Sequence, residues 1–281
     1  MAPGLIEPIL AFFFGLIIGS FLNVCIHRWP RGRSVVRPRS HCVRCRKIIP
    51  WYDNIPLFSY LALGGKCRFC GRRISLRYPV VELLTGLVFF FFVRTLGPTL
   101  VAVKMCVFGA ILVALIFTDI EKRLLPDELT LGGAVVGVLF AFFVPVPDFT
   151  AKAFLWFVGI EIHGRAQWIA EAALGSLLPA FFLWLAGWIY ERLRHKEGLG
   201  LGDVKLIVMM GAFLGWKAIP FIIFASSLAG SIVGVSMMLI QKKDSKLAIP
   251  FGPYLAFGAV LYIFYGGRLI QWYLHVGGFA R

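Results

Sequence analysis

Four cysteines give the clearest chemical signal in this sequence of 281 residues. Cys42 and Cys45 form one C-x2-C pair, and Cys67 and Cys70 form a second pair after 21 intervening residues. Two thiolates separated by two residues can bind one metal ion from a tight turn, so the four together predict a Zn²⁺ site. A zinc ion held by four cysteines has no open position for water or substrate, so we expect it to be structural.

The two cysteine pairs also allow a second interpretation, as the disulfide-exchange centre of a membrane thiol-disulfide oxidoreductase. We favour zinc because the surrounding basic residues place the cysteines on the cytoplasmic side, where stable disulfides are rare. Gly64, Gly65 and Gly71 flank the second pair and let its backbone turn toward the sulfurs. Cys25 and Cys106 lie in apolar runs, and we assign them no function.

Two aspartates are the candidates for acid–base chemistry. Asp119 follows an apolar run in TDIEKRLLPDELT, and Asp203 ends GLGLGD just before a short apolar run. Ionisable residues near membrane depth are functional candidates by default, and Glu82 and Glu171 are the other two acids in such positions. Two carboxyl groups that share a proton can activate water and protonate a leaving amine, which suffices for peptide hydrolysis without a metal.

Asp203 also has a structural interpretation, as the cap of a helix that begins at Val204. As a helix, the apolar run after it rises only about 18 Å, so either the glycine loop dips into the bilayer or the helix continues past Trp216. Gly200 and Gly202 would let the backbone approach a bound peptide closely. A helix interrupted by glycines is also typical of cation transporters. In a transporter the acids are expected near the bilayer midplane, whereas we expect Asp119 at the membrane surface, which argues against this alternative.

Composition identifies a membrane protein, because 59% of the residues are hydrophobic and the mean hydropathy is +0.82. Eight apolar runs are long enough, or nearly so, to cross a hydrocarbon core of about 30 Å. The sequence therefore predicts an all-α polytopic membrane protein with about eight transmembrane helices. The runs cover residues 8–27, 78–96, 99–118, 129–145, 168–190, 204–217, 219–240 and 250–275.

Basic residues predict the orientation of these helices, since positively charged loops stay in the cytoplasm. With both termini outside, the cytoplasmic segments 28–77, 119–126, 191–203 and 241–248 hold 21 of the 29 lysines and arginines. Attraction of this face to anionic membrane lipids accounts for the net charge of +15 without nucleic acid. The first run lacks the flanks of a signal peptide, so we expect a retained helix and an intact N terminus.

The connections predict three parts. Residues 1–27 form the first transmembrane helix, 28–77 a small cytoplasmic zinc module inserted between helices 1 and 2, and 78–281 a seven-helix membrane core. The module has too few apolar residues for a core of its own, so it needs the metal. We expect an external loop near residues 146–167. Four G-x-x-x-G spacings predict close helix packing: Gly15/Gly19, Gly133/Gly137, Gly211/Gly215 and Gly230/Gly234.

Taken in order, the motifs resemble those of the bacterial type IV prepilin peptidases, which are GxGD-type intramembrane aspartyl proteases. The resemblance rests on GSFLNVCIHRWP at 19–30, the two C-x2-C pairs, WYDNIPLFSYLALGGKC at 51–67 and RYPVVELLTG at 77–86. It continues through TDIEKRLLPDELT at 118–130, EGLGLGDVKL at 197–206 and IPFGPYLAFG at 249–258. Presenilin-like and signal-peptide-peptidase-like proteases share GxGD, but neither resembles the cysteine module.

The resemblance implies that Asp119 and Asp203 are the catalytic pair. It implies cleavage of a short basic leader from type IV prepilins or type II secretion pseudopilins, on the cytoplasmic side of the bacterial inner membrane. It also implies N-methylation of the new N-terminal residue with S-adenosylmethionine, an activity of members that carry the cysteine module. The sequence has no Rossmann-like glycine pattern after a strand, so the residues of the methyl-donor site stay unassigned.

Four acidic residues lie in the segments that carry the aspartates: Glu121, Asp127, Glu128 and Glu197. A basic leader is repelled on average by a chain of charge +15, so we hypothesise that these acids form a cradle that orients it. Alternatively the acids serve structure. Asp127, after Pro126, can begin a helix with Glu128 in its first turn. The nearby cations available for pairing are Lys122, Arg123 and Lys196.

Overall fold

The computed structural model describes residues 4–146, 150–157, 159–195, 200–241 and 250–276, and these are mainly helical. The chain divides into two compact units, residues 1–122 and residues 123–281. The boundary follows the helix that carries Asp119, so it differs from the three functional parts expected from the sequence, which stay a prediction.

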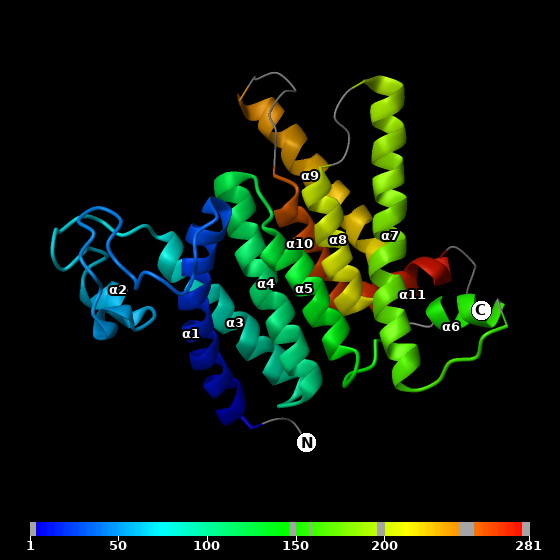
Figure 1. The fold of residues 1–281 in the computed structure, drawn as a ribbon, viewed down its shortest axis with the longest axis horizontal. Helices are drawn as coiled ribbons and strands as arrows, with labels where there is room; N and C mark the ends of the chain where they lie inside the picture. The colour runs from blue at the N-terminus through cyan, green and yellow to red at the C-terminus, as the bar shows by residue number, and fades with distance from the viewer. Residues whose placement is uncertain (1–3, 147–149, 158, 196–199, 242–249, 277–281) are drawn as a thin grey trace. The chain divides into compact units, whose positions relative to one another are not determined.

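The first unit holds three long helices that lie side by side (Figure 1): α1 (Ile6–Arg28), α3 (Arg77–Leu96) and α4 (Leu100–Lys122). Glycines bring α1 and α3 into backbone contact. A Cβ at Gly19 would lie 2.7 Å from the Cα of Glu82, and a Cβ at Gly15 would lie 2.8 Å from the carbonyl oxygen of Thr85. The close packing predicted for Gly15/Gly19 is therefore confirmed.

The segment between α1 and α3 is the four-cysteine module. It contains two 3₁₀ turns, Trp29–Arg31 and Trp51–Asn54, the short helix α2 (Phe58–Ala62) and two isolated β-bridges. Arg28, at the end of α1, is 7% exposed because its guanidinium donates hydrogen bonds into the loop that follows. The acceptors are the carbonyl oxygens of Ser34, Val35 and Pro38. The module is thus tied directly to the end of α1.

The second unit contains seven helices among the residues that the structure describes. They are α5 (Asp127–Phe140), α6 (Thr150–Phe157), α7 (Arg165–Arg194), α8 (Leu201–Leu214), α9 (Ala218–Gln241), α10 (Gly252–Leu261) and α11 (Gly267–Val276). A π-helical turn, Tyr262–Gly266, joins the last two.

Helix α8 is the most buried helix of the second unit. A Cβ at Gly211 would overlap the backbone of Gly175 on α7, and a Cβ at Gly137 of α5 would lie 2.8 Å from the Phe213 ring. Phe213 and Met210 are fully buried. The glycine spacings therefore mark real close contacts around α8, whereas at Gly230 the nearest atom lies at an ordinary 3.7 Å.

Six helical stretches of the described residues are long and apolar enough to cross a membrane, as in a multi-pass membrane protein. They are α1, α3, α4, α7, α9 and the stretch from α10 into α11. The other two predicted spans correspond to α5 and α8, which have 14 residues each and rise only about 21 Å. The expectation that α8 continues past Trp216 is wrong, because Gly215 ends the helix with a φ of 83°.

The expected external loop near 146–167 is in part the helix α6. Glu171 of α7, which is 1% exposed, accepts hydrogen bonds from the first amides of α6. These bonds come from the N–H groups of Ala151 at 2.8 Å and Lys152 at 3.1 Å. A carboxylate at a helix N terminus satisfies amides that lack a partner within the helix. Glu171 is therefore accounted for by a structural role.

Candidate functional site

Each cysteine pair lies in a tight turn of the same kind. In the first, the Cys42 N–H donates to the Lys47 carbonyl at 2.9 Å, and the Arg46 N–H donates back to the Cys42 carbonyl at 2.9 Å. Arg46 has a φ of 58°, which is uncommon for a residue with a side chain. The turn presents the Cys42 and Cys45 sulfurs on one side, as a metal site requires.

The second turn repeats the first. The Cys67 N–H donates to the Arg72 carbonyl at 2.8 Å, and the Gly71 N–H donates to the Cys67 carbonyl at 2.9 Å. Gly71, with a φ of 64°, takes the position that Arg46 has in the first turn. The sequence analysis overlooked this repeat, which is visible in the aligned segments CVRCRKII and CRFCGRRI.

The four sulfurs fit a zinc ion. All four Sγ atoms lie within 4.8 Å of one another, and those of Cys42 and Cys70 are 4.0 Å apart. Four sulfurs at about 2.3 Å from a tetrahedral zinc are separated by about 3.8 Å. The N–H groups of Cys70 and Phe69 lower the pKa of the Cys67 thiol to about 7, which favours the thiolate that zinc binds. Cys25 and Cys106 are buried elsewhere.

Asp119 lies on α4, one turn before the helix ends at Lys122. The residue is 6% exposed, and the preceding Thr118 is fully buried. Its position at the end of a membrane-length helix is as expected from the sequence. The same helix buries Lys104 at 1% exposure, a charged residue that the sequence analysis overlooked because an apolar run surrounds it.

Asp203 belongs to the second unit and is partly buried in the first turn of α8. The helix begins at Leu201, and its N-cap is Gly200, so the interpretation of Asp203 as the cap is wrong. A Cβ at Gly200 would lie 3.4 Å from Oδ2 of Asp203, and a Cβ at Gly202 would lie 3.3 Å from Leu125. The backbone of the GxGD motif therefore lies directly against the carboxylate.

Three of the four proposed leader-binding acids are in the described part of the chain, and Glu197 lies outside it. Glu121 accepts hydrogen bonds from Arg77 at 2.7 Å, and Asp127 accepts one from Lys205 at 2.7 Å. These partners are distant in sequence and were not among the expected cations. Asp127 and Glu128 also lie in the first turn of α5, as expected for a helix start after proline.

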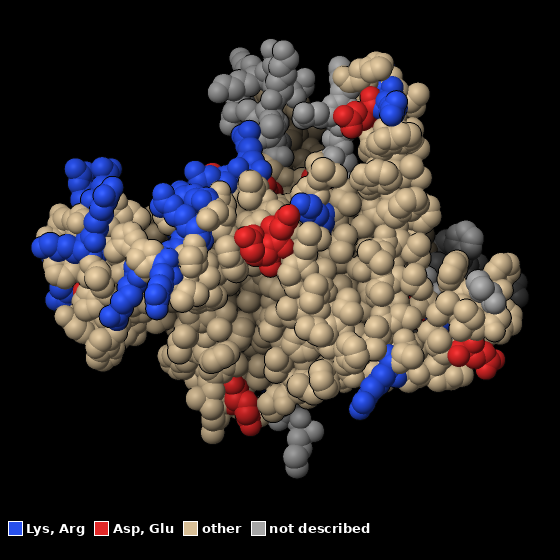
Figure 2. Space-filling view, in the orientation of Figure 1, with Lys and Arg blue, Asp and Glu red and all other residues tan. Residues whose placement is uncertain are grey.

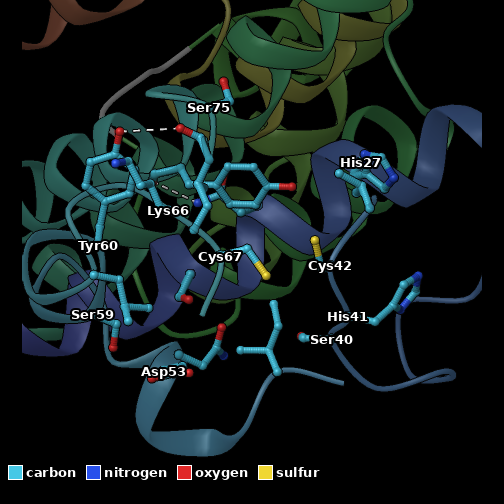
Figure 3. Close-up of a pocket in the computed structure, with 18 of the residues that line it drawn as sticks. His27, Ser40, His41, Cys42, Asp53, Ser59, Tyr60, Lys66, Cys67 and Ser75 are labelled. Atoms are coloured by element: carbon cyan, nitrogen blue, oxygen red, sulfur yellow. Dashed lines mark hydrogen bonds between the residues drawn. The ribbon is translucent and has the colours of Figure 1, made fainter. Parts of the chain in front are cut away.

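A cavity of about 890 Å³ lies within the first unit, between the module and the ends of α1 and α3. Figure 3 shows Cys42 and Cys67 on one wall, with Tyr60, His27 and Asp53 around the same space. Eight lysines and arginines and three acids line the cavity. Figure 2 shows the basic side chains gathered over the module and the helix ends beside it.

Two buried polar residues line this cavity: Glu82, which the sequence identified as an acid at membrane depth, and Asn23, which it did not single out. Glu82 is 8% exposed and accepts a hydrogen bond from the Leu57 N–H at 2.9 Å. Asn23 is 2% exposed and donates to the carbonyl oxygens of Gly19 and Tyr78, but its Oδ1 has no hydrogen-bond partner in the part of the chain that the structure describes. Glu82 was visible as an acid at membrane depth, but its partner is a backbone group that no sequence pattern identifies.

Comparisons with known proteins found matches along most of the chain. The model of the bacterial peptidase A24 N-terminal domain matches residues 13–96, and that of the type IV leader peptidase family matches residues 106–235. Similar proteins named prepilin leader peptidase/N-methyltransferase occur in Aeromonas salmonicida (strain A449), at 36% identity over 94% of this chain and 93% of theirs, and in Pseudomonas aeruginosa, at 35% over 94% and 92%. A Myxococcus xanthus protein of this name is 38% identical over 84% of this chain and 66% of its own length. No solved structure matches this chain.

The geometry of the four cysteines predicts one zinc ion per chain. Replacing one ligand, as in Cys67→Ser, leaves three thiolates and is expected to lower the bound zinc well below one ion per chain. Elemental analysis of the purified protein measures this directly. Cys106→Ser is the matched control and should retain the metal. Equal zinc contents in the two variants would contradict the assignment.

Proposed function

Because the chain belongs to the type IV leader peptidase family, we propose that Asp119 and Asp203 are the carboxyl groups with which it cuts prepilin leaders. The enzyme is bifunctional, a leader peptidase and an N-methyltransferase, as its family and the shared name of its relatives support. Its substrates are type IV prepilins or type II secretion pseudopilins. Neither the family models nor the relatives support the alternative of a thiol-disulfide oxidoreductase.

The chemistry needs two carboxyl groups that share one proton. The ionised carboxylate takes a proton from water, and the water oxygen attacks the carbonyl carbon before the cut. The protonated partner then donates to the leaving amine as the C–N bond breaks. Because coupled carboxyls titrate as a pair, either aspartate can serve as the base in a given step.

The observation that carries this proposal is the burial of Asp119, which is 6% exposed on a helix long and apolar enough to cross a membrane. A carboxyl group in such a place is costly, so it is a functional candidate, and none of the structural hydrogen bonds that explain Glu171 involves Asp119. Asp203 lies in the first turn of α8, where the partial positive charge of a helix N terminus favours a carboxylate. The absence of a side chain at Gly200, where a Cβ would lie 3.4 Å from Oδ2 of Asp203, would let a peptide backbone approach that carboxylate.

The membrane arrangement is part of the proposal. We place the protein in the inner membrane with eight spans, both termini outside and both activities toward the cytoplasm. The excess of basic residues in the predicted cytoplasmic segments supports this orientation. Residues 28–77 then form the methyltransferase-associated zinc module and residues 78–281 the protease core. The short helices α5 and α8 count among the eight spans.

Two cofactors follow from these activities. The four thiolates would hold a structural zinc ion, which would fix the module without taking part in either reaction. S-adenosylmethionine, when bound, would supply the methyl group for the new N-terminal amine, which would give up one proton on methylation.

The acidic cradle also remains our proposal, with Glu128 as the member for which the described residues provide no ion-pair partner. Glu121 and Asp127 have cationic partners, whereas Glu128 is exposed in the first turn of α5. Glu128→Lys is expected to lower kcat/KM severalfold for a leader with several basic residues and less for one with a single basic residue. Glu161→Lys is a control at another exposed position. Equal effects on both leaders would contradict the cradle.

The catalytic pair is tested with Asp119→Asn and Asp203→Asn, which keep the side-chain size and remove the shared proton. Each is expected to lower cleavage of a purified prepilin by about 10²-fold or more. Glu171→Gln makes the same chemical change at a buried carboxylate with a structural role and should keep cleavage. Full activity in either aspartate variant would refute the pair.

A further inference from the structure

We propose that the cavity between the four-cysteine module and the ends of α1 and α3 binds the methyl donor, with Glu82 facing the sulfonium group. The inference rests on the proposed N-methyltransferase activity and assigns it a site in this chain. Its supports are the size of the cavity, a buried carboxylate in its wall, and an unsatisfied acceptor beside that carboxylate.

The size of the cavity suits a nucleoside-sized ligand. Its volume of about 890 Å³ falls within the range of about 300–1,000 Å³ that small-molecule sites occupy. The module supplies one wall, including Tyr60 and Ile74, and the last turns of α1 and first turns of α3 supply another. A ligand there would lie between the module, which the proposed zinc ion would fix, and two packed helices. Both walls would therefore be in place before the ligand binds.

Glu82 is the acid of the cavity wall that no cation in the described structure neutralises by an ion pair. The other two acids have such partners, since Asp53 binds Arg68 at 2.6 Å and Glu121 binds Arg77 at 2.7 Å. Glu82 instead accepts hydrogen bonds from two neutral groups, the Leu57 N–H at 2.9 Å and the Ser20 side chain. Its negative charge is therefore available to a cationic ligand group, and burial strengthens that attraction.

The backbone at Leu57 gives a second indication of a functional role. Leu57 has a φ of 58° and a ψ of −48°, an unfavourable conformation for a branched side chain. The bond to Glu82 holds this conformation and fixes the direction of the carboxylate. Backbone strain of this kind is typical of ligand-binding sites.

Unsatisfied polar atoms complete the pattern. Asn23, which is 2% exposed, lines the cavity, and among the described residues neither its Oδ1 nor the buried Nε of Arg77 has a hydrogen-bond partner. One is an acceptor and the other a donor. An amino-acid group, with its ammonium and carboxylate, needs that combination. Groups left unpaired in the free protein are candidates for bonds to a ligand.

S-adenosylmethionine has the three groups that this wall matches. At its amino-acid end, the ammonium can donate to Asn23 and the carboxylate can accept from the arginines. The positively charged sulfonium can face the carboxylate of Glu82, and the adenine can stack on the Tyr60 ring. The excess of basic residues disfavours a leader with several positive charges more than it disfavours S-adenosylmethionine, whose single excess positive charge is the sulfonium opposite Glu82. Glu121 also lines the cavity, two residues after Asp119 on α4, so the new amine is expected to form close to the donor.

Binding measurements on the full chain in lipid nanodiscs test the proposal. The probes are S-adenosylmethionine and S-adenosylhomocysteine, which differ in the methyl group and in the positive charge on sulfur. Glu82→Gln keeps an oxygen for the Leu57 N–H but removes the negative charge. We expect Glu82→Gln to weaken the binding of S-adenosylmethionine about tenfold or more, a change of about 1.4 kcal/mol in binding free energy. It should weaken the binding of S-adenosylhomocysteine, whose sulfur carries no charge, much less.

Glu171→Gln is the matched control, because it changes a buried carboxylate of the second unit and should leave both affinities unaltered. If Glu82→Gln weakens both probes equally or neither, the assignment is overturned. Ultraviolet crosslinking of bound S-adenosylmethionine to the wild-type chain gives a readout that needs no variant. Label within residues 20–82 supports the cavity, and label confined to residues beyond 123 overturns it. Prepilin cleavage and methylation by the wild type test the proposed function separately.

Discussion

The structure depends above all on the requirement that a carboxylate removed from water must have a partner. Glu171 meets it by holding the first amides of α6 against α7, and Glu82 meets it by holding the Leu57 amide of the module against α3. Each bond joins a loop or short element to a long helix. A hydrogen bond between a charged group and a backbone amide contributes about 1.5–3 kcal/mol, and losing it would strand a buried charge. Glu171 is thus explained by architecture, whereas Glu82 combines this structural bond with a charge that no ion pair in the described structure neutralises.

Asp119 differs from these two acids in its position, because it lies near the end of its helix. It lies at the end of a helix that is apolar for most of its length, next to the residues that pair with the start of α3. The bond between Arg77 and Glu121 ties α3 to α4 two residues from the aspartate. Helix packing through Gly15 and Gly19 holds α1 against α3. The aspartate is therefore held on a rigid support, which catalysis by a positioned carboxyl group requires.

The sequence predicted those features that depend on local spacing. The C-x2-C pairs predicted a metal site whose sulfurs do converge, and Pro126 followed by Asp127 predicted the start of α5. Contacts between distant residues could not be predicted in this way. Nothing in the sequence indicates that Lys205 pairs with Asp127. Nor does it indicate that Glu171 of α7 accepts hydrogen bonds from the first amides of a helix within the expected loop at 146–167. The short length of the apolar run predicted a short α8, but the run alone could not decide whether the helix continues past Trp216, and in the structure it ends at Gly215.

The central claim is that Asp119 and Asp203 meet and share a proton. The most direct measurement uses Asp119→Cys with Asp203→Cys in a chain that also carries Cys25→Ser and Cys106→Ser, treated with a short thiol-specific crosslinker. Asp127→Cys with Lys205→Cys is the positive control, since Nζ of Lys205 donates to Oδ1 of Asp127 at 2.7 Å in the unaltered chain. The account predicts that peptide mapping finds residues 119 and 203 joined as efficiently as the control pair. A control that crosslinks while residues 119 and 203 stay separate would contradict it.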